Sequence, residues 1–182
     1  MNTSSDGVID PRQFRNALGR VASGVTVITT EKDGQIHGMT ANAFVSVSLE
    51  PPLVLVSVDN RTHMNQLLPE SKRYGVSVLA HNQESLSNHF ARRPVEGLKI
   101  PFIEKHGTPV LDGAVAQLVA RVVDIRPAGD HTLYIGQIEY LEWTDEQPLL
   151  FFAGKYHHLK IEQQKPSTHP EDDFSLFLFG NM

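Results

Sequence analysis

Two short apolar runs joined by a pair of prolines constrain the fold of this chain most. Phe44–Leu49 and Leu53–Val58 are rich in β-branched residues, and Glu50-Pro51-Pro52 joins them. This pattern predicts two neighbouring, largely buried strands. A patch of small and polar residues, Gly38-Met39-Thr40-Ala41-Asn42, precedes the first run. At the mouth of a buried sheet, such a patch lets the backbone come close to a phosphorylated aromatic cofactor.

The expected elements are mostly strands with hairpin turns, which favours an antiparallel barrel over a fold that alternates strands and helices. We expect six or seven strands and two or three helices. The strand-like runs are 25–30, 44–49, 53–58, 74–80, 115–125, 132–143 and 149–153, and the turn Lys32-Asp33-Gly34 also predicts a hairpin partner for the first of them. The last two long strands are expected to bend at Pro127-Ala128-Gly129.

Helices are expected in three places. The first begins at Pro11, capped by Asp10, and is closed by Gly24. The second runs from Arg61 to Leu68 and is stopped by Pro69, and the third covers 84–92 before Pro94. Residues 95–113 include Pro101, Gly107, Pro109 and Gly113 and are expected to form an irregular, mobile excursion.

Four segments in sequence order resemble the short-chain flavin reductases, which are built on the FMN-binding split β-barrel. The segments are F-R-N-A-L-G-R-V-A-S-G-V-T-V-I-T-T from Phe14, G-M-T-A-N-A-F-V-S-V-S-L-E-P-P-L-V-L-V-S-V from Gly38, G-D-H-T-L-Y-I-G from Gly129, and P-L-L-F-F-A-G-K-Y-H from Pro148. Each is weak alone, but together they span about residues 14–159. The resemblance implies a mainly β, antiparallel split barrel with a few helices.

The resemblance also implies a function. Similar proteins are NAD(P)H:flavin oxidoreductases that transfer a hydride from NADH or NADPH to FAD or FMN. They supply the reduced flavin to a separate monooxygenase, often one that acts on aromatic compounds. The family's flavin sites lie at a homodimer interface, so a homodimer is expected here.

Two other functions stay open. One is a flavin-binding electron carrier resembling flavoredoxin, reduced by a partner protein. The motifs at 129–132 and 154–157 argue against it. The other is a split-barrel oxidase of the pyridoxamine-phosphate type, which would need a strongly basic phosphate pocket that the sequence does not show.

The resemblance assigns the first flavin contacts to the patch before the first strand and to the end of the second. The residues are Gly38, Met39, Thr40, Asn42 and Ala43, then Ser57, Val58 and Asp59. Thr40 is expected to offer its hydroxyl and Asn42 its amide, whereas the second group is expected to act largely through backbone atoms. On local sequence alone, Thr40 and Asn42 are equally well explained as turn residues.

A third contact is expected where the flavin phosphate or ribityl chain meets a helix. It comprises the segment Ser87-Asn88-His89-Phe90, with Ser87, His89 and Phe90 as the expected contacts. Many relatives carry an arginine directly before this phenylalanine, whereas this chain has His89 there and Arg92 and Arg93 shortly after. Which residue balances the phosphate charge is therefore open, and His63, at another family contact position, is a further candidate.

Two later segments are expected to face the reacting rings. The family places the histidine of Gly129-Asp130-His131-Thr132 beside the flavin ring and the nicotinamide, so His131 is the expected catalytic residue. Lys155, Tyr156 and His157 are expected near the nicotinamide nucleotide. The alternative for His131 is an exposed imidazole in a hairpin turn.

Composition excludes several other kinds of chemistry. The 182 residues include no cysteine, which excludes disulfides, thiolate zinc sites and iron–sulfur clusters. A net charge of −5 argues against non-specific nucleic-acid binding. His157 and His158 are adjacent, and neighbouring strand residues point to opposite faces, so no metal site is expected.

We expect one domain, 1–162, followed by a tail of different composition, 163–182. The polar start has no signal-peptide pattern and no apolar run approaches the roughly 20 residues of a membrane span, so a cytoplasmic protein is expected. The tail ends in the apolar segment 174–179. We expect that segment to dock on the barrel or on a partner subunit.

Overall fold

The computed structural model describes residues 9–160, and most of the regular elements in this range are strands. The strands are β1 (Ser23–Gly24), β2 (Thr26–Lys32), β3 (Gln35–Ala41), β4 (Phe44–Ser48), β5 (Leu53–Asp59), β6 (Arg73–Val78), β7 (Phe102–Lys105), β8 (Thr108–Leu111), β9 (Ala116–Ala128), β10 (His131–Trp143), β11 (Leu150–Phe152) and β12 (Lys155–His157). The helices are α1 (Pro11–Leu18), α2 (Met64–Ser71) and α3 (Glu84–Phe90).

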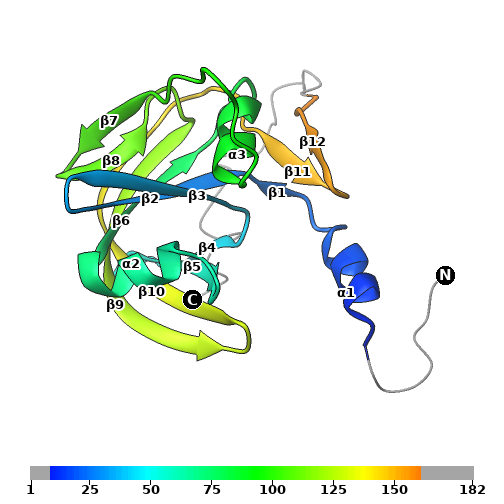
Figure 1. Ribbon diagram of the computed structural model, residues 1–182, viewed down its shortest axis with the longest axis horizontal. Coiled ribbons are helices and arrows are strands. Elements are labelled where there is room, and N and C mark those ends of the chain that lie inside the picture. Colours follow the sequence, from blue (N-terminus) through cyan, green and yellow to red (C-terminus); the bar gives the residue numbers. More distant parts are fainter. Residues whose placement is uncertain (1–8, 161–182) are drawn as a thin grey trace, which may run out of the picture.

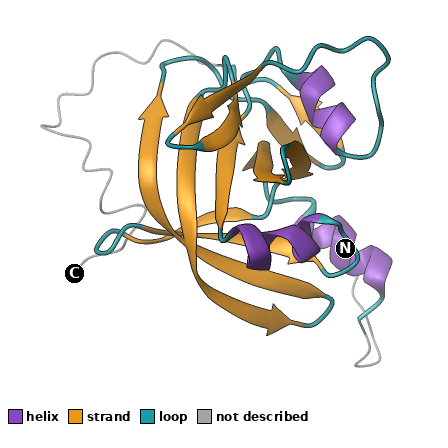
Figure 2. Ribbon diagram, turned by 60° about the vertical axis from the view of Figure 1, so that its left-hand side comes forward, coloured by secondary structure: helices purple, strands orange, loops and turns teal. Residues whose placement is uncertain are grey.

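Seven of these strands form one antiparallel sheet in the order β3-β2-β6-β9-β10-β5-β4. The sheet curls around its core (Figures 1 and 2). Its two edge strands, β3 and β4, follow one another in the chain and are joined by Asn42 and Ala43. The sheet is therefore open along the seam between them. The mainly β, antiparallel split barrel expected from the sequence is confirmed.

The core lies in two clusters of buried side chains. Inside the curled sheet, Tyr74, Tyr134 and Val56 are essentially inaccessible to solvent. A second cluster, which includes Leu79 and Leu111, lies under α3 and the β7–β8 hairpin. Fully burying one such side chain contributes about 1.5–3 kcal/mol to the stability of the fold. The core therefore stabilises the curled sheet whose edge strands border the seam.

The second helix runs from Met64 to Ser71, so Pro69 lies inside it. The expected start at Arg61 and the expected stop at Pro69 were wrong. Proline has no N–H and leaves the carbonyl four residues earlier without its helical donor. Here the Tyr134 hydroxyl donates to Asn65 Oδ1 at 2.6 Å and also lies 3.1 Å from that carbonyl, Asn65 O, which partly compensates for the missing bond.

The first helix is shorter than expected. It ends at Leu18 with Gly19 as its C-cap, whereas Gly24 lies in β1 and pairs with Leu150 of β11. None of its residues is buried, and in Figure 1 it stands apart from the barrel.

Two later segments are more ordered than expected. Residues 95–113 were expected to be irregular, but they contain the β7–β8 hairpin, whose turn residues His106 and Gly107 both have positive φ. That backbone is typical of a tight hairpin turn. Lys155–His157 were expected to follow the last strand, but they form β12, paired with β11 through the turn at Ala153 and Gly154.

Other expected elements are confirmed. The β2–β3 hairpin turns at Asp33 and Gly34, both with positive φ, and the strands joined by Pro51 and Pro52 pair as β4 and β5. The third helix ends at Phe90, before Arg92 and Pro94. The additional strands are short, which is why the expected count of six or seven was too low. The expected docking of the tail, 163–182, concerns residues outside the described range.

Candidate functional site

Three adjoining cavities follow the edge strand β3 along the seam of the sheet. The central cavity, about 280 Å³, lies between β3, the end of β5, the residues after α3 and the start of β10. The tyrosine cavity, about 270 Å³, shares Thr40, Asn42 and Ala91 with it and reaches the β11–β12 hairpin. The histidine cavity, about 160 Å³, shares Met39, Phe90 and other residues with it and reaches α2.

The central cavity brings together residues from four distant parts of the sequence. Eight of the expected site residues line it: Met39, Thr40, Asn42, Ala43, Ser57, Asp59, Phe90 and His131. Their side chains are mostly small, which leaves one face of the seam open. No ladder of hydrogen bonds joins β3 to β4, so residues 39–43 border the central cavity along an open edge.

His131 is held at the edge of the central cavity by its neighbours. It lies directly opposite Asp59 in the pairing of β10 with β5. Its Nδ1 is 2.7 Å from Asp130 Oδ1, which leaves Nε2 as the ring nitrogen that Asp130 does not engage. This hydrogen bond to His131 also holds the pKa of Asp130 below its ordinary value.

The Asp59 carboxylate is fixed by Arg61. Arg61 Nη2 donates to Asp59 Oδ2 at 2.6 Å and Nε donates to Oδ1 at 3.0 Å. These side-chain bonds, together with a backbone bond from Arg61, hold the pKa of Asp59 well below its ordinary value. Asp59 therefore stays ionised at the cavity wall, with its charge balanced by Arg61.

The turn that carries His131 is tied to the turn after β5. Thr132 Oγ1 donates to Asn60 Oδ1 at 2.7 Å, and Asn60 N donates to Asp130 O at 3.0 Å. The turn at Gly129 and Asp130 is therefore hydrogen-bonded to the turn that follows β5. This arrangement fixes the position of the imidazole relative to β5.

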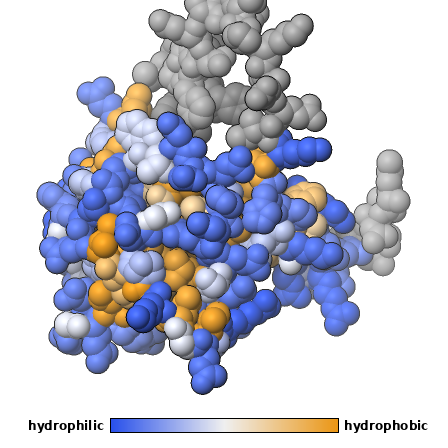
Figure 3. Space-filling model, turned by 90° about the horizontal axis from the view of Figure 1, so that it is seen from above, coloured by the Kyte–Doolittle hydropathy of each residue, from blue (hydrophilic) through white to orange (hydrophobic). Residues whose placement is uncertain are grey.

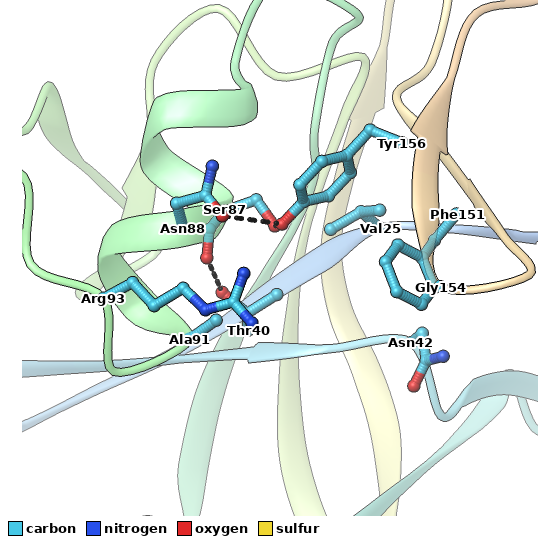
Figure 4. Close-up of a pocket in the computed structure, with 10 residues that line it drawn as sticks. All are labelled: Val25, Thr40, Asn42, Ser87, Asn88, Ala91, Arg93, Phe151, Gly154 and Tyr156. Carbon is cyan, nitrogen blue, oxygen red and sulfur yellow. Dashed lines mark hydrogen bonds between the residues drawn. The ribbon is translucent and has the colours of Figure 1, made fainter. Parts of the chain in front are cut away.

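Ser87 connects three elements around the tyrosine cavity (Figure 4). Its carbonyl accepts a hydrogen bond from Thr40 Oγ1 of β3 at 2.7 Å, and its hydroxyl lies 2.8 Å from the Tyr156 hydroxyl of β12. Tyr156 Oη also donates to Asn88 Oδ1 at 3.4 Å. The fully buried Ser87 therefore connects α3 to both β3 and β12 through these hydrogen bonds.

The absence of a side chain at Gly38 lets the ring of Phe90, at the end of α3, pack against β3. A Cβ at Gly38 would lie 2.6 Å from Phe90 Cδ1, closer than real side chains approach. The ring of Phe90 therefore packs directly against the strand backbone and borders both the central and the histidine cavity. The expected contact residues Gly38 and Phe90 are brought together by this packing.

Some expected site residues lie elsewhere. The Val58 side chain is fully buried in the core, and Val58 lines none of the three cavities. His89 packs edge-on against Phe90, and its Nδ1 accepts from Val95 N at 3.4 Å. Lys155 and His157 are exposed and line none of the three cavities, whereas Tyr156 and His63 each line one.

The structure adds residues that were not singled out as contacts. They are His37, Thr62, Ala91 and Phe151, together with Arg92 and Arg93, which were noted only as possible charge partners. Arg92 has a φ of +63°, which directs the chain back over the site after α3. Only its position after Phe90 pointed to it in the sequence.

Metal and membrane signals were also sought within the described range. Residues 9–160 contain no group of three or more His, Asp or Glu side chains placed to hold a metal ion. No helix of this range combines the length and the apolar character that crossing a membrane requires.

Comparison with known proteins identifies what this geometry resembles. The family profile described as "Flavin reductase like domain" matches residues 18–160. An NADH-dependent flavin reductase of Rhodococcus sp is 46% identical over 159 residues, which cover 86% of this chain and 90% of that protein. The reductase component of 4-hydroxyphenylacetate 3-monooxygenase from Thermus thermophilus is 40% identical over 147 residues, covering 80% and 95%.

A solved structure shows the same architecture. The flavin reductase PheA2 in its native state superposes with a TM-score of 0.82 at 49% identity. The match covers 84% of this chain and all of that chain. The strands that border the three cavities therefore belong to an arrangement already seen in another protein.

Proposed function

This chain belongs to the flavin reductase like domain family, and on that basis we propose that it is an NADH-dependent flavin reductase. It transfers a hydride from NADH to FAD or FMN and supplies reduced flavin to a separate monooxygenase. The similarity to a named monooxygenase reductase component supports the second half of this proposal. The same similarity supports an aromatic substrate for the partner.

The observation that carries the proposal is the convergence on the central cavity. Thr40, Asn42, Ser57, Asp59 and His131 come from three strands and the link between β3 and β4, and they face one space at the open seam. Phe90 closes one side of that space with an apolar ring, and the Gly38 backbone lies under it. A flat, partly polar ring system needs such a combination of close backbone, apolar wall and a few polar groups.

The residues around this space have separable roles. When flavin and NADH are both bound, the nicotinamide supplies a hydride, and so two electrons, to the flavin ring. Asn42 and Thr40 orient the ring, and the Asp130–His131 pair keeps Nε2 of the imidazole available to a ligand. Such an imidazole can orient the dinucleotide or stabilise negative charge that develops on the ring.

The tyrosine cavity is the proposed place of the nicotinamide nucleotide. It adjoins the central cavity through Thr40 and Asn42 and is open to solvent beside the β11–β12 hairpin. Tyr156 presents its ring there while its hydroxyl is held by Ser87. Hydride transfer requires two rings at near-attack distance rather than a general base, and two adjoining cavities provide for two rings.

A homodimer is the proposed assembly. Apolar side chains of α1 and of the segment that follows it are more than half exposed: Phe14, Leu18 and Val21 are 52%, 56% and 68% accessible. Elsewhere apolar areas interrupt a mostly hydrophilic surface (Figure 3). An amphipathic helix that stands off its own barrel is well placed to be covered by a second copy.

The deciding experiment is NADH and NADPH oxidation by the purified chain with FAD, FMN or no flavin added. We expect NADH turnover that saturates with added flavin and falls by at least about tenfold in His131→Ala. Preference between FAD and FMN is read from the same curves. Tight flavin binding without nicotinamide turnover would instead favour the partner-reduced electron carrier.

A further inference from the structure

Asn60, the residue that follows β5, lines none of the three cavities, yet it makes three hydrogen bonds to the hairpin turn that carries His131. Its backbone N donates to Asp130 O at 3.0 Å. In its side chain, Nδ2 donates to Gly129 O at 3.4 Å and Oδ1 accepts from Thr132 Oγ1 at 2.7 Å. One residue therefore binds the chain on both sides of His131, while the His131 ring borders the central cavity.

The orientation of the Asn60 amide follows from its two partners. A backbone carbonyl can only accept, so the amide nitrogen faces Gly129 O and the amide oxygen faces the Thr132 hydroxyl. A carboxylate at this position would have no donor for the Gly129 carbonyl. The two side-chain bonds therefore require an amide.

The turn that carries Asn60 is itself held in shape. Asp59 Oδ1 accepts from Arg61 N at 2.8 Å, which is the bond of an Asx turn. Asp59 O accepts from the backbone N–H of Thr62 at 3.0 Å and from its hydroxyl at 2.8 Å. Asn60 is thus a fixed point against which the neighbouring hairpin can be held.

The hairpin lies where the sheet is weakest. His131 is the first residue of β10, and it pairs with Asp59, the last residue of β5, and with Ala128, the last residue of β9. The ends of paired strands open more readily than their centres. Without the bonds of Asn60, these terminal pairs alone would hold the imidazole in place.

We propose that Asn60 is a positioning residue of the reductase, which holds His131 where its imidazole meets the two reacting rings. The inference rests on the proposed function, because His131 acts there on the flavin and the nicotinamide. Catalytic groups must be held within about 0.5 Å of their productive geometry. A misplacement of about 1 Å can cost roughly 100-fold in rate. The three bonds of Asn60 supply this constraint from outside the cavities.

Thr132→Val is the sharpest test, because valine has the shape of threonine without its hydroxyl. It removes the bond to Asn60 Oδ1, and Asn60→Ala removes both side-chain bonds. We expect kcat for NADH oxidation to fall about 3- to 10-fold in each variant. Flavin affinity, measured by flavin fluorescence, should stay within about twofold of wild type because neither residue lines a cavity. Thr132→Ser keeps the hydroxyl and should restore most of the rate.

A double-mutant cycle distinguishes positioning from a general loosening of the fold. Thr132→Val introduced into His131→Ala should cause no further fall in kcat, because the group that it misplaces is already absent. An equal fall in both backgrounds overturns the inference. Wild-type kcat in both Thr132→Val and Asn60→Ala also overturns it.

Thr144→Val is the matched control. Thr144 follows the other end of β10, lines none of the three cavities, and its hydroxyl oxygen accepts from Glu146 N at 3.4 Å. We expect wild-type kcat in this variant. A fall as large as that of Thr132→Val would mean that the loss of any turn hydroxyl slows the enzyme, and would overturn the role of Asn60.

Nuclear magnetic resonance of the imidazole separates this inference from the proposed function. Signals that couple the ring 1H and 15N atoms, assigned with His131→Ala, report which nitrogen of His131 carries the proton at about pH 8. The bond to Asp130 predicts Nδ1 in the wild type, and Asn60→Ala should mix the two tautomers whereas Thr144→Val should not. If this is observed while the wild type does not oxidise NADH, the reductase proposal fails and the positioning of His131 stands. If NADH is oxidised but neither the tautomer nor kcat changes in Asn60→Ala, the positioning role fails and the reductase stands.

Discussion

The ring of Phe90 occupies the space that a side chain at Gly38 would need. Phe90 Cδ1 lies 2.6 Å from the position of a Cβ on Gly38, so a substituted strand and the ring exclude one another. The ring of Phe90, which borders both the central and the histidine cavity, therefore keeps its position only because residue 38 of β3 has no Cβ. Helix α3 is thereby seated on the strand that borders the site.

Gly38→Ala should push Phe90 away from β3 and weaken flavin binding by roughly tenfold, with a loss of about 1–3 kcal/mol in the free energy of unfolding from overpacking. Flavin titration and urea unfolding measure the two effects. Gly24→Ala is the matched control, since nothing lies within 4 Å of its Cβ position. Equal behaviour of the two variants would contradict the role assigned to the Gly38–Phe90 contact.

Tyr156→Phe removes the hydroxyl that meets Ser87 and leaves the buried Ser87 hydroxyl without this partner. We expect a loss of about 1–2 kcal/mol in unfolding free energy. The KM for NADH should rise about 3- to 10-fold with kcat nearly unchanged, because the hairpin beside the tyrosine cavity loosens. Tyr140→Phe, whose hydroxyl bonds Glu142 on another surface, is the control. A KM unchanged relative to Tyr140→Phe would count against the assignment of this cavity to the nicotinamide nucleotide.

Arg61→Gln should make the pH dependence of stability shallower on the acid side. Arg61 lowers the pKa of Asp59, so the pair stabilises the folded chain above the ordinary aspartate pKa of about 3.9. That contribution is lost as pH falls through the lowered pKa of the folded state. The stability difference between wild type and variant should therefore narrow from about pH 5 towards pH 2 in urea unfolding. Arg126→Gln, at the exposed pair with Asp124, provides the comparison, and a gap for Arg61→Gln that widens in acid would refute the linkage.

Tyr74→Phe should stabilise the chain by about 1–2 kcal/mol, because its buried hydroxyl has no hydrogen-bond partner among the described residues. Burial also raises the pKa of this phenol, so it stays neutral. Tyr134→Phe, equally buried, should instead destabilise by about 1–2 kcal/mol, since its hydroxyl bonds Asn65 on α2. Thermal and urea unfolding of the two variants measures both effects. A change of stability in the same direction for both would contradict the roles assigned to the two hydroxyls.

Leu18→Glu should weaken the proposed dimer. The residue lies on α1 and is 56% exposed in the single chain, so a charge there is tolerated by the monomer but not beneath a second copy. Light scattering during size-exclusion chromatography should show a shift towards monomer at micromolar concentration. Leu141→Glu, 52% exposed on β10, should leave the mass unchanged. A wild-type chain that is itself monomeric would rule out the assembly.

Sequence reasoning reached much of the site because its main segment is continuous. Residues 38–43 form the end of β3 and the link to β4, so their shared location follows from chain order alone. His131 was predicted from the resemblance of Gly129-Asp130-His131-Thr132 to a family motif, and in the structure hydrogen bonds of Asn60 to Asp130 and Thr132 hold this turn against the end of β5.

What the sequence missed depends on packing between distant segments. Arg92 reaches two cavities only because the chain reverses at a positive φ after α3, which no local pattern signals in an arginine. His37 and His63 meet because β3 and α2 pack together, although they are 26 positions apart in the chain. Pro69 appeared to be a helix stop because its compensating donor, Tyr134, lies 65 positions later.

The buried position of Ser87 has an evolutionary consequence. Its carbonyl holds the strand beside the central cavity and its hydroxyl holds the hairpin beside the tyrosine cavity. A substitution there should alter both cavities at once, so under the proposed assignment of flavin and nicotinamide one nucleotide preference is not expected to change at this position without disturbing the other. Divergence in the choice of hydride donor is therefore expected at residues such as Arg93 that border a single compartment.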